Sequence, residues 1–417
     1  MSIGWVHFSS DHRKKVQSVI DLLNKGGVVD ELGIGIIRDS YANTMFPGIS
    51  TIQTRAKYFT LTAHLLKNYV EKYKTDRKKI PLEVYLKKVE LECRIRMMGN
   101  SQSEEDQAGV IGSTFGKNRT KDVVRRASSI YWNGLRTFGF LDTKKSLSEY
   151  SRDLGSQEAT LGKLLAETST TKGDDIDAEY SLPIVKAPSL PGNYLETLSI
   201  NLLPVEANYL RSQIESTRPG SLIGRILQST EATNEFIELS THSFSEFSEL
   251  PFLKDLKDNF LQKVVVSANK FWEIFYGAHI RYNCLLQKQY GNSAKFDEFQ
   301  SLWNGWLKGL EKHIYNWDTE FLFEILDLNK RAIQPQSEKF VRGWINEISK
   351  KDIDVDKCDQ LVRTQEKFNK KKRARLVHGN NEVIEVWIGL RTLNYRLPEV
   401  HRIVSDIVAA ETESSNA

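Results

Sequence analysis

Apolar side chains recur every three or four residues along most of the chain, the spacing that gathers them on one face of an α-helix. The clearest case predicts a helix over about Ile52–Lys74, whose apolar face is formed by Ala56, Phe59, Ala63, Leu66, Val70 and Tyr73. Aromatic-rich stripes over Leu253–Phe275 and Trp303–Ile314 predict further buried helices, because such stripes are more often core than ligand site. The pattern therefore predicts a mainly α, multi-helical protein with two lobes.

Residues 151–192 interrupt the helical pattern. Part of this region is poor in large apolar side chains, and Pro183, Pro188 and Pro191 exclude one long helix. We therefore predict an N-terminal helical domain over 1–150, a linker or irregular segment over 151–192 and a C-terminal helical domain over 193–417. The last domain is expected to begin with helices over Tyr194–Leu203 and Pro204–Thr217.

The stretch Glu31–Phe59 concentrates glycine, proline and charged residues between two apolar helical patterns. It is expected to hold a short helix over Gly35–Met45 that ends before a proline. We interpret the stretch as a structural joint, in which special backbone residues turn the chain and charges pin it: Arg38, Pro47, Gly48 and Arg55.

Three carboxylates in and beside this joint allow a second interpretation. Asp30, Glu31 and Asp39 carry the oxygen ligands that divalent metals prefer, which makes a metal-dependent nuclease an alternative function. Carboxylates and arginines this close together more often form a structural ion-pair network. Their spacing matches no recognised metal motif, so we expect no metal and no cofactor.

Residues 80–142 are expected to follow the order helix, short helix or turn, helix and apolar exit, which is typical of winged-helix and helix-turn-helix modules. The last helix, predicted over Lys121–Thr137, would then lie in the major groove of DNA. Its inward stripe would be Val124, Ala127, Tyr131 and Leu135, and its DNA-facing stripe Arg125, Ser129, Asn133 and Arg136. Phosphate contacts are expected just before it, at Arg119 and Lys121. The alternative is an ordinary amphipathic helix whose polar side is basic.

A second basic feature lies near the end of the chain. Arg363 and Lys367 precede a dense cluster formed by Lys370, Lys371, Lys372, Arg373 and Arg375. Such a cluster can neutralise phosphates, and its binding would weaken with salt. The alternative is a solvated charged helix with no ligand.

Composition narrows the class of protein without deciding its activity. The chain has 417 residues, with 58 basic and 54 acidic side chains and a net charge of +4, so bulk charge does not indicate nucleic acid. Three widely spaced cysteines suit a reducing compartment and show no metal-binding spacing. No apolar run approaches the length of a membrane span. We expect a cytoplasmic protein that does not contact a membrane.

Known catalytic motifs are missing from the sequence. The histidines show no metal spacing, and no Gly-x-Ser-x-Gly elbow is present. Gly112–Lys117 resembles a fragment of a phosphate-binding loop, but it lacks the required spacing and no strand pattern precedes it. An enzyme is therefore not the favoured prediction.

Several motifs together carry a resemblance to a known family. They are Gly4-Trp5-Val6-His7-Phe8-Ser9, Asp30-Glu31-Leu32-Gly33-Ile34-Gly35, Ile37-Arg38-Asp39, Phe46-Pro47-Gly48, Ser50-Thr51-Ile52-Gln53-Thr54-Arg55-Ala56, Gly109-Val110-Ile111-Gly112, Arg126-Ala127-Ser128-Ser129-Ile130-Tyr131-Trp132-Asn133-Gly134-Leu135 and Leu393-Asn394-Tyr395-Arg396. With them the chain resembles a prokaryotic family catalogued as domain of unknown function 6361, from whose pattern it departs at His7 and Ala127.

The family name implies no activity. What the resemblance suggests by association is a DNA-directed system, such as phage defence, with helicase or nuclease proteins as partners. We therefore expect a non-catalytic component of a prokaryotic multi-protein system that contacts double-stranded DNA. The alternatives are the metal-dependent nuclease and a protein-binding scaffold that does not contact nucleic acid.

Overall fold

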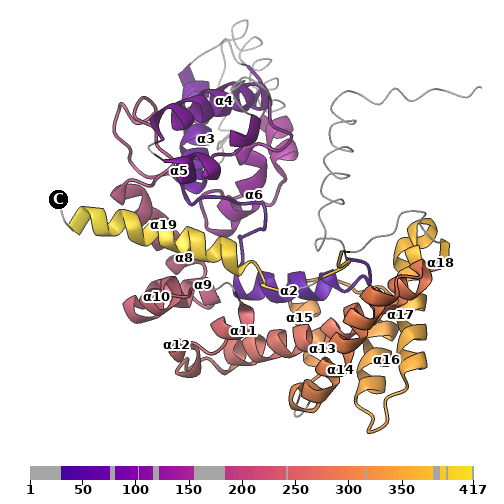
Figure 1. Ribbon diagram of the computed structural model, residues 1–417. Helices are drawn as coiled ribbons and strands as arrows, with labels where there is room; N and C mark the ends of the chain where they lie inside the picture. The colour runs from indigo at the N-terminus through magenta and orange to yellow at the C-terminus, as the bar shows by residue number, and fades with distance from the viewer. Residues whose placement is uncertain are drawn as a thin grey trace, which may run out of the picture. The chain divides into compact units, whose positions relative to one another are not determined.

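The computed structural model describes residues 30–75, 80–101, 103–115, 122–154, 184–240, 243–314, 317–378, 386–390 and 393–415. Within these ranges the regular structure is helical (Figure 1), and strand-like pairing is limited to one antiparallel bridge between Leu141 and Val185. The predicted mainly α, multi-helical fold is confirmed. No helix in the described ranges is long and apolar enough to cross a membrane.

The chain forms two compact units, and each unit combines stretches that are distant in sequence. Unit 1 contains the residues up to Met45 and Leu239–Leu397, and unit 2 contains Phe46–Glu238 and Pro398–Ala417. This division differs from the expected consecutive domains. Local periodicity predicts helices, whereas the units are set by contacts between segments hundreds of residues apart, which periodicity does not encode. The part of the expected linker within the described ranges belongs to unit 2.

Unit 1 is organised around one long buried helix. Its helices are α2 (Gly35–Met45), α11 (Phe244–Phe247), α12 (Pro251–Lys254), α13 (Asn259–Tyr290), α14 (Ser293–Ile314), α15 (Phe321–Leu328), α16 (Pro335–Ile348), α17 (Val355–Lys370), η2 (Lys371–Arg373) and α18 (Arg375–His378). The predicted short helix over Gly35–Met45 is confirmed with both ends. Helix α13 packs against α14, α17 and α2, and α16 packs against α17.

A close approach of two helices explains one glycine and one aromatic stripe of unit 1. A Cβ atom at Gly277 of α13 would lie 2.4 Å from the Trp306 ring of α14, so only glycine admits the indole there. Trp306 donates its indole N–H to the carbonyl of Glu273, and Trp344 of α16 donates to the carbonyl of Ile274. The aromatic stripe therefore belongs to the core, as predicted.

None of the described helices of unit 2 is as long as α13 or α14 of unit 1. The helices of unit 2 are α3 (Lys57–Thr75), α4 (Leu82–Asn100), α5 (Glu104–Gly109), η1 (Ser113–Phe115), α6 (Ala127–Thr137), α8 (Pro204–Thr217), α9 (Leu222–Gln228), α10 (Thr230–Ile237) and most of α19 (Leu397–Ser415). Helix α3 packs against α4, α6 and α8. The prediction for Pro204–Thr217 is confirmed with both ends.

Helix α3 begins at Lys57, later than the predicted Ile52. The Tyr131 hydroxyl of α6 accepts hydrogen bonds from the backbone N–H groups of Thr54 and Arg55, at 2.8 and 3.1 Å. The Asp406 carboxylate of α19 accepts from the N–H of Ala56 at 2.8 Å. Because these distant side chains hold the backbone before Lys57, the local pattern predicted too early a start.

The predicted helix over Tyr194–Leu203 is wrong: these residues form turns and irregular backbone. A buried polar cluster holds the segment in place. Tyr194 donates its hydroxyl hydrogen to Glu206 Oε1 at 2.8 Å, and the N–H of Leu203 donates to Glu206 Oε2 at the same distance. Lys57 Nζ lies 2.6 Å from Glu206 Oε2, and both side chains are buried. These tertiary contacts override the weak helical pattern.

Candidate nucleic-acid interface

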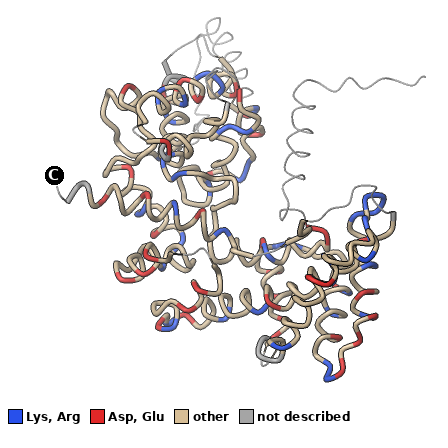
Figure 2. The backbone as a smooth tube through the Cα atoms, in the orientation of Figure 1, with Lys and Arg blue, Asp and Glu red and all other residues tan. Residues whose placement is uncertain are grey.

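The basic cluster near the end of the chain spans the last turn of α17, η2 and the first residue of α18, and we call this stretch the basic turn (residues 367–375). Figure 2 shows Lys and Arg gathered at this position. Four of its cations are exposed and form no ion pair with the residues that the structure describes: Lys367, Lys371, Lys372 and Arg373. Unpaired exposed cations keep their full charge for an external anion.

A buried carboxylate fixes the shape of the basic turn. Glu366 is fully buried, and its two oxygens accept hydrogen bonds from the N–H groups of Arg375 at 2.7 Å and Leu376 at 3.0 Å. The Tyr282 hydroxyl of α13 donates to Glu366 Oε1 at 3.0 Å. Burial raises the pKa of Glu366 above its ordinary value. This one side chain closes the turn and ties it to α13.

The two remaining basic residues of the basic turn are less exposed, and they are held through a side chain at Lys370 and through the backbone at Arg375. Lys370 Nζ lies 3.2 Å from Glu31 Oε2, and both side chains are largely buried. Arg375 is half-buried, and its backbone carbonyl accepts a hydrogen bond from Gln289 at 3.1 Å. Within the predicted cluster, the structure therefore separates anchoring residues from exposed ones.

The apex of the basic turn has an unusual backbone. Lys371 has φ 52° and ψ −119°, a conformation that residues with a side chain rarely adopt. Its N–H donates to the carbonyl of Lys367, which ends α17. Strained positions of this kind persist only where surrounding contacts hold them, and they are common at functional sites.

Helix α6 fits the predicted DNA-facing stripe less well. It begins at Ala127, so Arg125 precedes the helix and does not share a helical face with the others. Ser129 and Asn133 are exposed, but the guanidinium of Arg136 donates to the Thr143 carbonyl at 2.9 Å.

Three residues predicted for the inner face of α6, Ala127, Tyr131 and Leu135, are buried. The prediction for Val124 is wrong, because it lies before the helix and is 45% exposed. Arg119 and Lys121 lie outside the described residues. The described residues of 80–142 contain no strand, so the winged-helix unit is not confirmed.

The three carboxylates of the nuclease alternative each have their own partner. Asp30 accepts hydrogen bonds from the N–H groups of Ile34 and Gly35, at 3.2 and 2.7 Å, and thus caps the start of α2. Glu31 pairs with Lys370, and Asp39 pairs with the neighbouring Arg38 at 2.8 Å. No group of three metal-binding side chains occurs in the described part of the chain. The geometry does not bring these carboxylates together.

Comparison with known proteins identifies the family of this chain. The family of unknown function DUF6361 matches residues 1–410. The chain belongs to this family. No curated protein and no solved structure matches it.

The residues predicted for the structural joint are divided between the two units, because the boundary between the units falls between Met45 and Phe46. Arg38 belongs to unit 1 and contacts Asp39. In unit 2, Gly48 has φ +84° and a Cβ there would lie 2.9 Å from Phe138, so the position requires glycine. Arg55 pairs with Asp406 of α19 at 2.9 Å.

Sequence reasoning missed the residues that hold the basic turn in place. Asn369 donates to the backbone carbonyls of Asp30 and Glu31, at 2.9 and 3.0 Å. Gln365 donates to the carbonyl of Leu32 at 2.7 Å, and Glu366 closes the turn. The available signal was that three polar residues lie among the apolar positions of a strongly amphipathic helix.

Proposed function

We propose that this protein is a non-catalytic component that binds double-stranded DNA through the phosphate contacts of its basic turn. The observation that carries the proposal is the set of four exposed cations without an ion-pair partner in the described residues, presented on a turn that a buried carboxylate closes. The predicted α6 surface is a weaker candidate, because Arg136 is engaged and Arg125 lies outside the helix.

The expected binding mode is electrostatic and independent of base sequence. Each neutralised phosphate releases counterions, so log K falls with log salt at a slope of about −0.9 per contact. Four contacts predict a slope of roughly −3.6, and hence roughly a hundredfold loss of affinity between 50 and 200 mM salt. Contacts to the phosphate backbone position a protein on DNA without reading its bases.

The setting we propose is a prokaryotic multi-protein DNA-directed system, such as phage defence, with a helicase or nuclease as partner. Support for this setting comes from the resemblance alone. In such a system a basic turn would hold the complex on DNA while a partner supplies the chemistry.

The decisive experiment measures the binding of the full chain to duplex DNA across a salt series. The test variant replaces Lys371, Lys372 and Arg373 with Gln, which is expected to reduce the salt slope by about 2.7. The matched control replaces three exposed lysines elsewhere in unit 1, Lys308, Lys339 and Lys351, with Gln and should leave the slope near the parent value. No binding at about 50 mM salt, or an equal loss in both variants, would overturn the proposal. Indifference to DNA would favour the protein-binding scaffold.

A further inference from the structure

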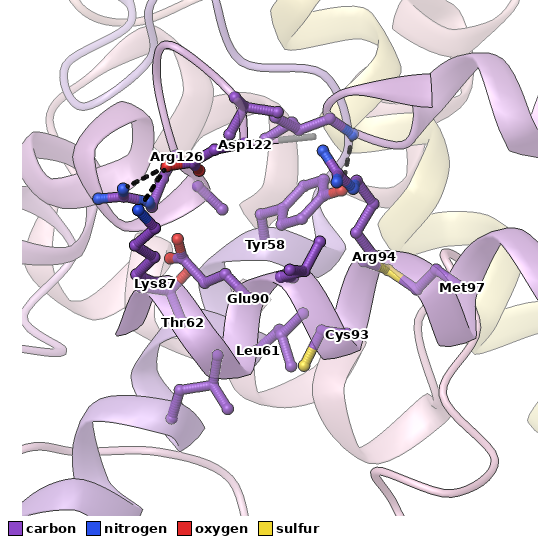
Figure 3. A pocket seen from close by; sticks show the side chains of 15 residues that line it. Tyr58, Leu61, Thr62, Lys87, Glu90, Cys93, Arg94, Met97, Asp122 and Arg126 are labelled. Atoms are coloured by element: carbon purple, nitrogen blue, oxygen red, sulfur yellow. Dashed lines mark hydrogen bonds and ion pairs between the residues drawn. The ribbon is translucent and has the colours of Figure 1, made fainter. Parts of the chain in front are cut away.

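A small pocket of unit 2, between α3, α4 and the start of α6, is lined by groups of both charges (Figure 3). Asp122 lies 2.9 Å from Arg126 and 3.4 Å from Lys87. Glu90 accepts a hydrogen bond from the N–H of Ser128 at 2.7 Å. Because cations and carboxylates of this pocket already pair with one another, the pocket indicates no single class of ligand. The basic turn of unit 1 carries a further inference.

An aromatic side chain lies among the exposed cations of the basic turn. Phe368 belongs to the last turn of α17, directly after Lys367 and three residues before Lys371. Its neighbours are directed inward: Glu366 accepts a hydrogen bond from a backbone N–H of α18, and Asn369 donates to two backbone carbonyls that precede α2. Phe368, in contrast, is 37% exposed. The outer surface of the turn thus presents a phenyl ring together with its cations.

The ring of Phe368 differs from the other exposed aromatic ring of the described residues. Phe260 is 44% exposed, and its ring packs edge-on against Phe321 with the centroids 6.1 Å apart. The ring of Phe368 makes no such contact with an aromatic ring or a cation of the described residues. Single exposed apolar residues are common on protein surfaces. What distinguishes Phe368 is that its open ring lies in a surface whose cations have no ion-pair partner in the described ranges.

Cations and an aromatic ring together suit the two parts of a nucleotide. Lysine and arginine neutralise phosphates, and an aromatic side chain stacks on the face of a base. In paired DNA the neighbouring base pairs cover both faces of each base, so a side chain can stack only if the duplex is partly unstacked, which costs energy. That cost is smallest where bases are already unpaired.

We propose that the basic turn binds DNA at unpaired bases, with the ring of Phe368 stacked on one base and the exposed cations on the flanking phosphates. This inference rests on the proposed DNA binding by the basic turn and specifies the form of DNA that is bound. The preference is for unpaired bases and not for a base sequence, because every base has a face on which a ring can stack.

The test measures the binding of the full chain to two duplexes of the same length, one fully paired and one with a short run of mismatched bases. Both carry the same number of phosphates, so the salt-dependent part of binding is nearly the same. The parent protein should bind the mismatched duplex roughly tenfold more tightly, as expected for stacking of one base on an aromatic ring. The salt slopes of the two duplexes should be similar.

Substitutions at Phe368 separate stacking from charge. Phe368→Leu should abolish the preference, because leucine is apolar but has no ring face. This variant should keep the parent affinity and salt slope on the paired duplex, which shows that the turn is intact. Phe368→Trp should retain or increase the preference. The matched control is Phe260→Leu, which removes the other exposed aromatic ring and should leave the preference unchanged.

Equal affinity of the parent protein for the two duplexes, with the salt slope intact, would overturn this inference and leave the proposed phosphate binding standing. A preference that persists in Phe368→Leu would also overturn it, because the flexibility of the mismatched DNA would then be the cause. An equal loss on both duplexes in Phe368→Leu would show that the ring acts as a wedge in paired DNA instead. Absence of binding to either duplex would overturn the proposed function, and this inference with it.

Discussion

Arg55 Nε lies 2.9 Å from Asp406 Oδ1, and the two residues are 351 positions apart in the sequence. Both side chains are largely buried, and Asp406 also accepts a hydrogen bond from the N–H of Ala56. One carboxylate of the last helix thus fixes both an arginine of the predicted joint and the backbone that leads into α3. Burial raises the pKa of Asp406, so the arginine offsets only part of the cost of burying this charge.

Replacing Asp406 with Asn should destabilise the protein by about 3 kcal/mol, because the arginine loses its buried counter-charge. The double variant Arg55→Met/Asp406→Leu should recover part of this loss, since removing both charges also removes their desolvation cost. Urea unfolding measures both effects. Asp153→Asn, which breaks the exposed pair with Lys145, is the control and should cost less than about 1 kcal/mol. Similar costs for Asp406→Asn and Asp153→Asn would contradict the role of burial.

Helices defined by local interactions could be predicted from the sequence, whereas features set by residues distant in the sequence could not. Gly35–Met45 and Pro204–Thr217 were predicted with both ends because glycine, proline and local apolar spacing define them. The start of α3 was missed because Asp406 and Tyr131 set it from distant parts of the chain. The composition of the two units was missed for the same reason.

The sequence predicted which basic residues form the candidate interface, but it did not predict which of them are exposed. A run of lysines and arginines from Lys370 to Arg375 is visible in the sequence. That Lys370 is anchored on Glu31 while Lys371 is exposed depends on the buried carboxylate of Glu366 and on the end of α17. The burial of Glu90 of α4 against the N–H of Ser128 of α6 had no sequence signal, because the two residues lie on separate helices.

Glu366→Gln should weaken DNA binding although it removes a negative charge. A glutamine cannot accept through its nitrogen, so one of the N–H groups of Arg375 and Leu376 loses its acceptor and the turn loosens. The cost in stability should be about 2 kcal/mol. If the cations acted only through total charge, the variant would bind DNA more tightly than the parent. Fluorescence anisotropy with duplex DNA separates these two outcomes.

The stability of unit 2 should fall as the pH rises from about 4.5 to about 7. Burial raises the pKa of Glu90 from its ordinary value of 4.5 to about 7. Over this range the unfolded chain has lost the proton while the folded chain retains it, so folding becomes less favourable by at most about 3 kcal/mol. Glu90→Gln should remove this part of the pH dependence. Urea unfolding from pH 4.5 to 8 measures it, and a parent curve that matches that of the variant would contradict the assignment.

Lys371→Gly should stabilise the fold and weaken DNA binding at the same time. Lys371 has φ 52°, a conformation that costs a residue with a side chain roughly 1–3 kcal/mol and glycine much less. After the greater flexibility of glycine in the unfolded chain is counted, the net gain should be about 1 kcal/mol. Loss of one phosphate contact should reduce the salt slope by about 0.9.

Lys372→Gly is the control. It removes the same charge without relieving a positive φ, so it should reduce the slope equally but destabilise the protein. If the two variants change stability in opposite directions but lower the salt slope of DNA binding equally, then Lys371 contacts phosphate from a strained backbone conformation. Equal stability changes in the two variants would show that the backbone at Lys371 is not strained.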